Sequence, residues 1–462
     1  MKTIIKNGII VTMNRDMDVY PDGYVVIEGT KIIDAGPMDM LKTRLGEQGT
    51  PMIGAEHANI GTEHANIGAE YTIIDAEHAI VMPGMVNTHC HMGMIPFRGL
   101  GDDCKDRLRV FLLPMESKSM DRELAELSSR YAVCELLLSG VTTVMDMYYF
   151  EDAVARAMDE MGIRGIAGET VMEDATCDAR NPEDAIERGR KLIERYGNHP
   201  RIKGCLAPHG TTTCSKETLQ KIHQIDKASG VPFTLHVAEM DYEMAYFEDQ
   251  YGCTPVEYLK EIGVLDGLTV SAHSIRLTDK DMKLMEENGC SVAHCIGSNT
   301  KAAKGVAPVR SMLERGITVG LGTDGPASGN TLDLFTQMRF CANFHKNETG
   351  DRSAFPARDI VFMATAGGAK ALGMDQMTGS LEAGKEADLV MVETDSPNMF
   401  PVYDPYAALV YSARADNVRD VFVAGKCLVR HKKMVSQDFG KIRESLRQKM
   451  NRTAFGEMGN LV

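Results

Sequence analysis

Histidine and acidic side chains end several apolar segments of this chain, in a pattern that could bind a metal ion. His89 and His91 end one segment, and because residues i and i+2 of a strand point to the same side, both can face one site. Three later segments end in or carry His236, His273 and Asp324. A buried imidazole cluster beside a carboxylate is costly without a cation, and three neutral histidines with one aspartate suit catalytic Zn²⁺ or Fe²⁺. We therefore predict a catalytic metal site among these residues.

These segments belong to a regular alternation of apolar, strand-like runs with helix-length stretches. The eight runs are Val81–His91, Thr142–Asp146, Arg164–Glu169, Ile202–His209, Phe233–Glu239, Leu268–His273, Ser291–His294 and Thr318–Asp324. Apolar strands separated by helices indicate an α/β fold with a parallel sheet buried on both faces, and closure at eight strands indicates a (β/α)8 barrel of the TIM type. In such barrels the active site lies at the carboxyl ends of the strands.

Both ends of the chain have the pattern of β structure. We expect short strands at Thr3–Ile5, Ile9–Met13 and Gly23–Glu28, separated by turn signals at Asn7-Gly8 and Asp22-Gly23. Near the other end, strands are expected at Asp388–Glu393 and Val418–Ala424. We therefore predict that the long middle of the chain forms the barrel and that the two ends form separate β structure.

Composition narrows the class of protein. The 462 residues exceed the ~250 of a barrel and leave room for a satellite domain. The formal net charge of -15 repels phosphate groups, so we expect neither nucleic acid nor an anionic membrane as a partner. Eleven cysteines without CxxC spacing are expected to be reduced thiols, and no run approaches the ~20 apolar residues of a membrane span. We predict a cytoplasmic protein that acts on a small molecule, with its oligomeric state open and a homo-oligomer included.

The hexapeptide EHANIG occurs twice, at Glu56–Gly61 and Glu63–Gly68. Its two histidines, seven residues apart, could in principle contact a metal ion. Two copies cannot form a solenoid, so we interpret the repeat as a duplicated surface loop.

The motifs at the strand ends resemble those of a known superfamily. The segments VMPGMVNTHCH (Val81–His91), LHVAE, SAHS and LGTDGPAS are similar to the metal-binding motifs of the amidohydrolase superfamily. The segments APHGTTTCS, GSNTKAAKGVAPV, GTDGPASGNTLDLFTQMR and GSLEAGKEADLV resemble, more narrowly, the 5-methylthioadenosine/S-adenosylhomocysteine deaminase group and its chlorohydrolase relatives. The likeness spans nearly the whole chain. It implies a barrel over residues 81–384 and one small β-sandwich built from residues 1–80 and 385–462, with a terminal helix.

The resemblance also implies a role for each residue of the site. It makes His89, His91, His236 and Asp324 the ligands of one divalent metal ion, with Zn²⁺ favoured over Fe²⁺. Glu239, His273 and Asp324 become catalytic: Asp324 takes a proton from water, Glu239 protonates a ring nitrogen, and His273 stabilises charge on the attacking oxygen. His209 becomes a substrate contact, as does Glu239. The residues support this independently, since Glu239 lies three positions after His236 and just past the strand end.

The substrate pocket departs from the pattern of these deaminases. They typically carry a Glu before a Trp that grips ribose hydroxyls, whereas this chain has Asp106 followed by Arg107. Asp106 is therefore our candidate for the ribose contact. The loop after the third strand carries Glu169 and Glu173 where those deaminases usually show arginine, and this negative charge would disfavour a substrate with a carboxylate tail.

We predict a metal-dependent deaminase of an aminated nitrogen heterocycle that releases ammonia, with an adenine nucleoside (5-methylthioadenosine, S-adenosylhomocysteine or 5-deoxyadenosine) as the leading substrate. Deamination of guanine, a pterin or another ring, and hydrolysis of a chlorinated triazine, use nearly the same site. A dinuclear cyclic-amide hydrolase would need a carboxylated lysine at the end of the fourth strand, but Lys203 lies near its start. A barrel without activity that serves as a scaffold would have no reason to retain all four ligands and Glu239.

Overall fold

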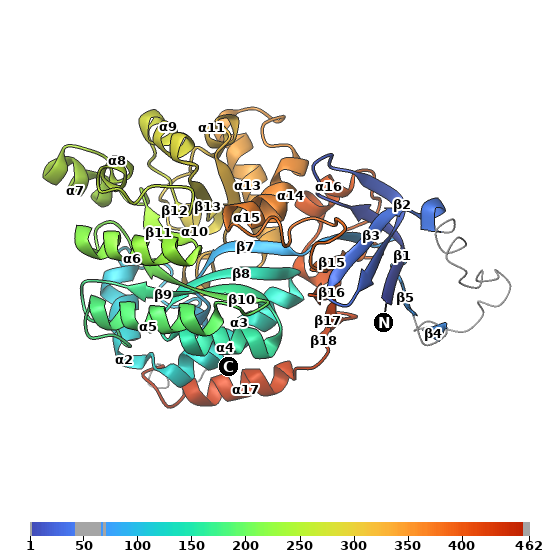
Figure 1. The fold of residues 1–462 in the computed structure, drawn as a ribbon, viewed down its shortest axis with the longest axis horizontal. Coiled ribbons are helices and arrows are strands. Elements are labelled where there is room, and N and C mark those ends of the chain that lie inside the picture. The colour runs from blue at the N-terminus through green and yellow to red at the C-terminus, as the bar shows by residue number, and fades with distance from the viewer. Residues whose placement is uncertain (1, 42–65, 68–70, 456–462) are drawn as a thin grey trace.

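The computed structural model describes residues 2–41, 66–67 and 71–455 (Figure 1). Eight parallel strands at its centre form two four-stranded sheets. The first has the order β10-β9-β8-β7 and the second the order β11-β12-β13-β14. Their bounds are β7 (Met85–Cys90), β8 (Val141–Tyr148), β9 (Arg164–Val171), β10 (Ile202–Pro208), β11 (Phe233–Val237), β12 (Thr269–His273), β13 (Ser291–His294) and β14 (Thr318–Leu321).

Backbone hydrogen bonds join the two sheets at both seams. His236 N donates to His209 O over 3.2 Å at the seam between β11 and β10, and Asp324 N donates to His89 O over 3.0 Å at the seam between β14 and β7. The eight strands thus form the barrel predicted from the sequence. Both seam bonds lie at the carboxyl ends of the strands and involve residues of the predicted metal site.

Helices cover the outside of the barrel and contribute short segments at its mouth. Their bounds are α2 (Leu113–Ser119), α3 (Arg122–Leu138), α4 (Glu151–Met161), α5 (Pro182–Tyr196), α6 (Lys216–Ser229), α7 (Asp241–Tyr251), α8 (Pro255–Glu261), α9 (Asp279–Asn288), α10 (Ile296–Lys301), α11 (Val309–Glu314), α12 (Pro326–Gly329), α13 (Leu334–Thr349), α14 (Ala357–Ala364), α15 (Ala366–Ala371), α16 (Pro405–Ala407) and α17 (Phe439–Met450). Shorter helical turns are η2 (Met92–Phe97), η3 (Leu108–Leu112), η4 (Ala408–Ser412) and η5 (Ala415–Asn417). Side-chain N-caps fix several starts, as Asp121 does for α3 and Thr254 for α8.

The two chain ends form one sheet beside the barrel, as expected. Its strands run in the order β18-β17-β16-β15-β6-β1-β2-β3, with β5 paired to β1 and β4 to β5. The bounds are β1 (Lys2–Val11), β2 (Val19–Glu28), β3 (Lys31–Pro37), β4 (Asn66–Ile67), β5 (Tyr71–Asp75), β6 (Ile80–Pro83), β15 (Leu389–Val392), β16 (Val418–Val423), β17 (Lys426–Arg430) and β18 (Lys433–Met434). N-terminal and C-terminal strands meet where β6 pairs antiparallel with β15.

Three predicted strand boundaries are wrong. The expected turn at Asp22-Gly23 lies inside β2, which runs from Val19 to Glu28. The sequence suggested a turn at Asn7-Gly8, but β1 is continuous there, and Asn7 adopts a left-handed φ of 59° that shifts the register instead of reversing the chain. The run Val81–His91 is not one strand, because Gly84 divides it into β6 of the end sheet and β7 of the barrel. A Cβ on Gly84 would lie 2.1 Å from Thr142 Oγ1, so only glycine fits at this crossing.

A buried ion pair ties the barrel to the end sheet. Arg164, at the start of β9, is fully buried, and its Nε donates to Asp388 Oδ2 over 2.6 Å while Nη2 donates to Oδ1 over 3.1 Å. Asp388 also accepts from Ala424 N over 2.7 Å. No helix within the described ranges is both long and apolar enough to cross a membrane. The EHANIG repeat lies outside the described residues except for Asn66 and Ile67.

Candidate metal centre and active site

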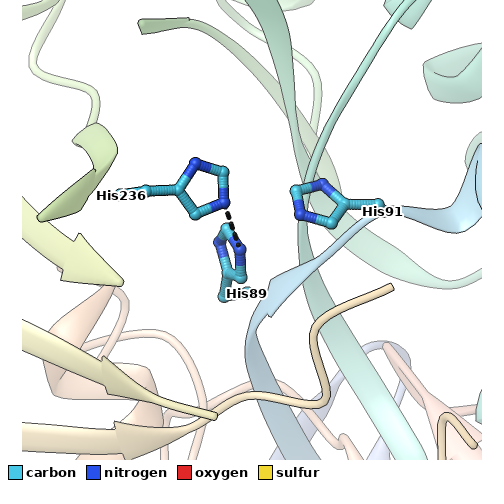
Figure 2. Close-up of side chains that lie close together, drawn as sticks. All are labelled: His89, His91 and His236. Carbon is cyan, nitrogen blue, oxygen red and sulfur yellow. Dashed lines mark hydrogen bonds between the residues drawn. The ribbon is translucent and has the colours of Figure 1, made fainter. Parts of the chain in front are cut away.

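Three imidazoles converge at the barrel mouth (Figure 2). His89 is on β7, His91 follows that strand directly, and His236 is on β11. The Nε2 atoms of His89 and His236 lie 3.1 Å apart, and one nitrogen from each of the three rings lies within 4.8 Å of the others. The i and i+2 spacing of the first two histidines therefore does bring both to one side.

Backbone carbonyls orient two of these rings. His91 Nδ1 donates to Met147 O and His236 Nδ1 donates to His209 O, each over 2.5 Å. A proton fixed on Nδ1 leaves the Nε2 lone pair for a metal ion. Burial, reinforced by the neighbouring imidazoles, holds the pKa of His89 and of His236 well below the usual value, so both rings are neutral. The Nδ1 atom of His89 is buried without a hydrogen-bond partner among the described residues.

Asp324 completes the donor set. Its Oδ1 lies 3.2 Å from His91 Nε2 and accepts from Gly325 N over 2.6 Å, and Oδ2 lies 4.0 Å from His273 Nε2. Although burial alone would raise it, the hydrogen bond from His91 and the nearby imidazoles hold the pKa of Asp324 well below its usual range. Although burial alone would lower it, Asp324 raises the pKa of His91 to about 9, so His91 holds a proton toward Asp324 when no metal is bound. Two neutral imidazoles and this His91–Asp324 pair fit a divalent ion, which would replace the proton on His91 Nε2.

Glu239 and His273 lie directly beside these donors. His273 Nε2 is 3.6 Å from Glu239 Oε1, and His273 Nδ1 donates to Asn299 Oδ1 over 2.8 Å. Glu243 fixes the turn after β11 by accepting from Ala238 N over 3.0 Å and from Glu239 N over 2.9 Å. Asn299 thus fixes the imidazole of His273, and Glu243 fixes the backbone turn that carries Glu239, as catalytic groups require.

Glu239 is also paired with a lysine. Lys304 Nζ donates a short hydrogen bond to Glu239 Oε1. Although burial alone would raise it, His273 and Lys304 lower the pKa of Glu239 to about 2. Lys304, Asn299 and Glu243 were not predicted from the sequence as residues of the site. The first two lie within the motif GSNTKAAKGVAPV, but nothing in their local spacing indicates that they point at Glu239 and His273.

His209 lies at the edge of the cluster. Its ring is 4.9 Å from that of His236, its Nδ1 is 3.1 Å from Thr213 Oγ1, and its carbonyl orients His236. Burial lowers the pKa of His209 to about 4, so the ring is neutral at physiological pH. This placement fits a residue that contacts a neutral ring or sugar.

Asp106 is not brought to the cluster. Its side chain is exposed, and no hydrogen bond or ion pair within the described part of the chain links it to a residue of the site. The neighbouring Arg107 points inward instead: its Nε donates to Leu100 O over 2.6 Å, and its Nη2 pairs with Asp102 Oδ1 over 3.1 Å.

The expected repulsion of a carboxylate tail by two glutamates is wrong for Glu169. This residue is buried and its pKa lies well above the usual value because of burial and the neighbouring Asp178, so it is uncharged. Glu173 is bound to the start of α6, where it accepts from Ser215 N over 2.8 Å and from Thr218 Oγ1 over 2.7 Å. Although burial alone would raise it, these hydrogen bonds lower the pKa of Glu173, so this exposed carboxylate keeps its negative charge and only Glu169 drops out of the expected repulsion.

The chain is similar in sequence to known proteins over most of its length. Residues 80–428 match the model of the Amidohydrolase family. The 5-methylthioadenosine/S-adenosylhomocysteine deaminase of Thermodesulfovibrio yellowstonii is 34% identical over 424 residues, which are 91% of this chain and 92% of that protein. A 5'-deoxyadenosine deaminase of Methanosarcina barkeri is 35% identical over 96% of each chain.

A solved structure is similar over almost the full length. The crystal structure of an adenosine deaminase from Xanthomonas campestris with bound zinc has a TM-score of 0.90 to this structure. It is 28% identical in sequence, and the match covers 97% of this chain and 98% of that chain. The similarity therefore includes the end sheet as well as the barrel.

Proposed function

This chain belongs to the amidohydrolase family and is a hydrolytic aminohydrolase that uses a divalent metal, and we propose that it deaminates an adenine nucleoside with one bound Zn²⁺ ion. The observation that carries the proposal is the convergence of a complete donor set and two further acid–base groups at one point. The donors are His89, His91, His236 and Asp324, and the acid–base groups are Glu239 and His273.

A single ion is favoured because β10 offers no bridging lysine at its carboxyl end. A dinuclear centre in this fold would need a lysine at the end of β10. The only lysine of that strand, Lys203, lies near its start, and its Nζ donates to Gly197 O over 2.7 Å away from the site. Zinc is favoured over iron because three imidazoles and one carboxylate form a common catalytic zinc set, and because the similar adenosine deaminase holds zinc.

The residues divide the chemistry among them. A divalent ion bound here would lower the pKa of water to ~7 and so supply a nucleophile at neutral pH. Glu239, which is ionised in the free enzyme, would take the first proton of the attacking water and carry it to the ring nitrogen next to the reacting carbon, which makes that carbon electrophilic. Asp324 would accept the second proton through Oδ2, the oxygen that lies nearest to His273, and return it to the amine. A C–O bond forms, the C–N bond to the exocyclic amine breaks, and ammonia leaves with the returned proton.

His273 is the residue proposed to stabilise the oxygen atom of the attacking water. Because Asn299 accepts from Nδ1, the ring is fixed with Nε2 between Glu239 and Asp324, at 3.6 and 4.0 Å. From there it stabilises charge that develops on the attacking oxygen. A residue held this way pays no reorganisation cost during the reaction.

The nucleoside is proposed because the relatives that are 34% and 35% identical are named as deaminases of adenine nucleosides. We propose His209 as a contact to the ring or sugar, because its ring lies 4.9 Å from that of His236. Asp106 is the proposed contact to the ribose diol, which requires the loop before η3 to approach the substrate. Reduced thiols, with all eleven cysteines unpaired, and a net charge of -15 support a cytoplasmic enzyme without a nucleic-acid partner.

A screen for ammonia release tests the proposal. Zinc-loaded protein is given 5-methylthioadenosine, S-adenosylhomocysteine, 5-deoxyadenosine, guanine, a pterin and a chlorinated triazine at equal concentration. We expect turnover of at least one adenine nucleoside and the corresponding inosine derivative as product. Turnover confined to guanine, a pterin or the triazine would contradict the nucleoside proposal, and chloride release would identify a chlorohydrolase.

A further inference from the structure

A lysine lies inside the acid–base group, in a position that the proposed reaction does not yet use. Lys304 is in the turn after α10, and its side chain retains only 21% of its surface exposed. Its Nζ bonds Glu239 Oε1, while His273 Nε2 approaches the same oxygen to 3.6 Å. No hydrogen bond to Glu239 Oε2 occurs within the described part of the chain, so Lys304 and His273 both lie at one oxygen.

The turn that carries Lys304 is built to bring it there. Lys304 N donates to Asn299 O over 2.9 Å, and Ala303 before it adopts a left-handed φ of 54°. The side chain of the same Asn299 accepts from His273 Nδ1 over 2.8 Å. Asn299 of α10 therefore fixes both neighbours of Glu239, Lys304 through its backbone and His273 through its side chain.

We propose that Lys304 is a positioning residue for proton transfer: it holds Glu239 by Oε1 and directs Oε2 at the ring nitrogen of the substrate. This inference rests on the proposed deaminase function and adds a residue to it. With Oε1 fixed, the carboxylate rotates less about its last bond, so the proton that it receives leaves from one defined oxygen.

Lys304 also sets the strength of Glu239 as an acid. The ionisable groups that face Glu239 are Lys304 from the α10 turn, His273 from β12, His236 and His209 from the ends of β11 and β10, and Glu243 from α7. Burial alone raises the pKa of Glu239, and the lysine offsets this. A stronger acid suits a weakly basic ring nitrogen, because proton delivery is then favourable once the carboxylate has taken up a proton.

The test compares three variants in zinc-loaded enzyme on an active nucleoside. Lys304→Met removes the charge and keeps the chain length, Lys304→Arg keeps the charge, and Lys301→Met is the matched control. Lys301 lies in α10 itself and pairs with Asp102 Oδ1 over 2.9 Å, outside the site. We expect Lys304→Met to lower kcat by ~10–10²-fold with KM and zinc content unchanged. Lys304→Arg should recover part of the loss, and Lys301→Met should match the wild type.

Two further readouts separate proton transfer from a merely structural role. In the Glu239→Gln background, Lys304→Met should cause no further loss, because the group that it acts on is gone. The acid limb of kcat/KM should move up by about 1–3 pH units in Lys304→Met, since Glu239 must be ionised in the free enzyme and an opposite charge no longer lowers its pKa.

Each alternative result has a defined meaning. Unchanged kcat and pH profile in Lys304→Met, or an equal loss in the Glu239→Gln background, would overturn the inference and leave the deaminase proposal intact. If Lys304→Met does not fold, Lys304→Gln carries the same test. Loss of zinc in both neutral variants would assign Lys304 to the metal-site scaffold and also overturn the inference. Wild-type enzyme without activity on any aminated ring would instead remove the proposed function.

Discussion

Glu239 and His236 lie three positions apart in the chain but have roles that single substitutions can separate. Glu239→Gln keeps the shape and cannot shuttle a proton, so turnover should fall by ~10²–10⁴-fold with zinc content unchanged. His236→Ala should lose zinc, because it removes one of the three converging imidazoles. Elemental analysis and ammonia release on the same preparations measure both. Near-wild-type turnover of Glu239→Gln would rule out the role assigned to it.

Asp106 offers a second test at the residue scale, on the sugar instead of the ring. If its carboxylate accepts from a ribose diol, Asp106→Ala should lose ~1–3 kcal/mol of kcat/KM on the nucleoside and nothing on free adenine. Asp103, an equally exposed aspartate of the same loop, gives the matched control Asp103→Ala. Equal effects of the two substitutions, or no effect of either, would exclude Asp106 as the ribose contact.

At the scale of elements, the Arg164–Asp388 pair should dominate the attachment of the barrel to the end sheet. Both side chains are fully buried, so Asp388→Ala removes the closest partner of a buried guanidinium and leaves only Glu386, 3.5 Å from Nη2, as its counter-charge. The substitution should lower the free energy of unfolding by ~3–5 kcal/mol. The pair formed by Arg122 and Asp152 joins two helices at the surface, and Asp152→Ala should cost less than ~1 kcal/mol. Denaturant unfolding compares the two. Equal losses would contradict this account.

The elements also explain what the sequence could and could not predict. His89 and His91 were predictable because strand periodicity alone puts i and i+2 on one side. Lys304 was not, since it reaches Glu239 across 65 positions of the chain through a turn whose left-handed residue is an alanine. The break at Gly84 was hidden because the residues directly before and after it, Met82, Pro83, Met85 and Val86, are all apolar and buried, so hydrophobicity marks no boundary there.

At the scale of the whole molecule, the sheet built from both chain ends is directly connected to the first strand of the barrel. β6 belongs to the N-terminal part of the chain and β15 to the C-terminal part, and the two strands pair directly. β6 is followed immediately by β7, which carries His89. Truncation of either end is therefore expected to disturb the metal site as well as the sheet, and full-length protein is the form in which the metal should be measured.

The most direct test of the central claim is a zinc titration of metal-depleted, full-length protein, followed by ammonia release from the active nucleoside. Because four donors converge on one point and no bridging lysine is present on β10, activity should rise linearly to one equivalent of zinc and then stay constant. Full activity without metal, or a maximum only at two equivalents, would contradict a mononuclear metal-dependent deaminase.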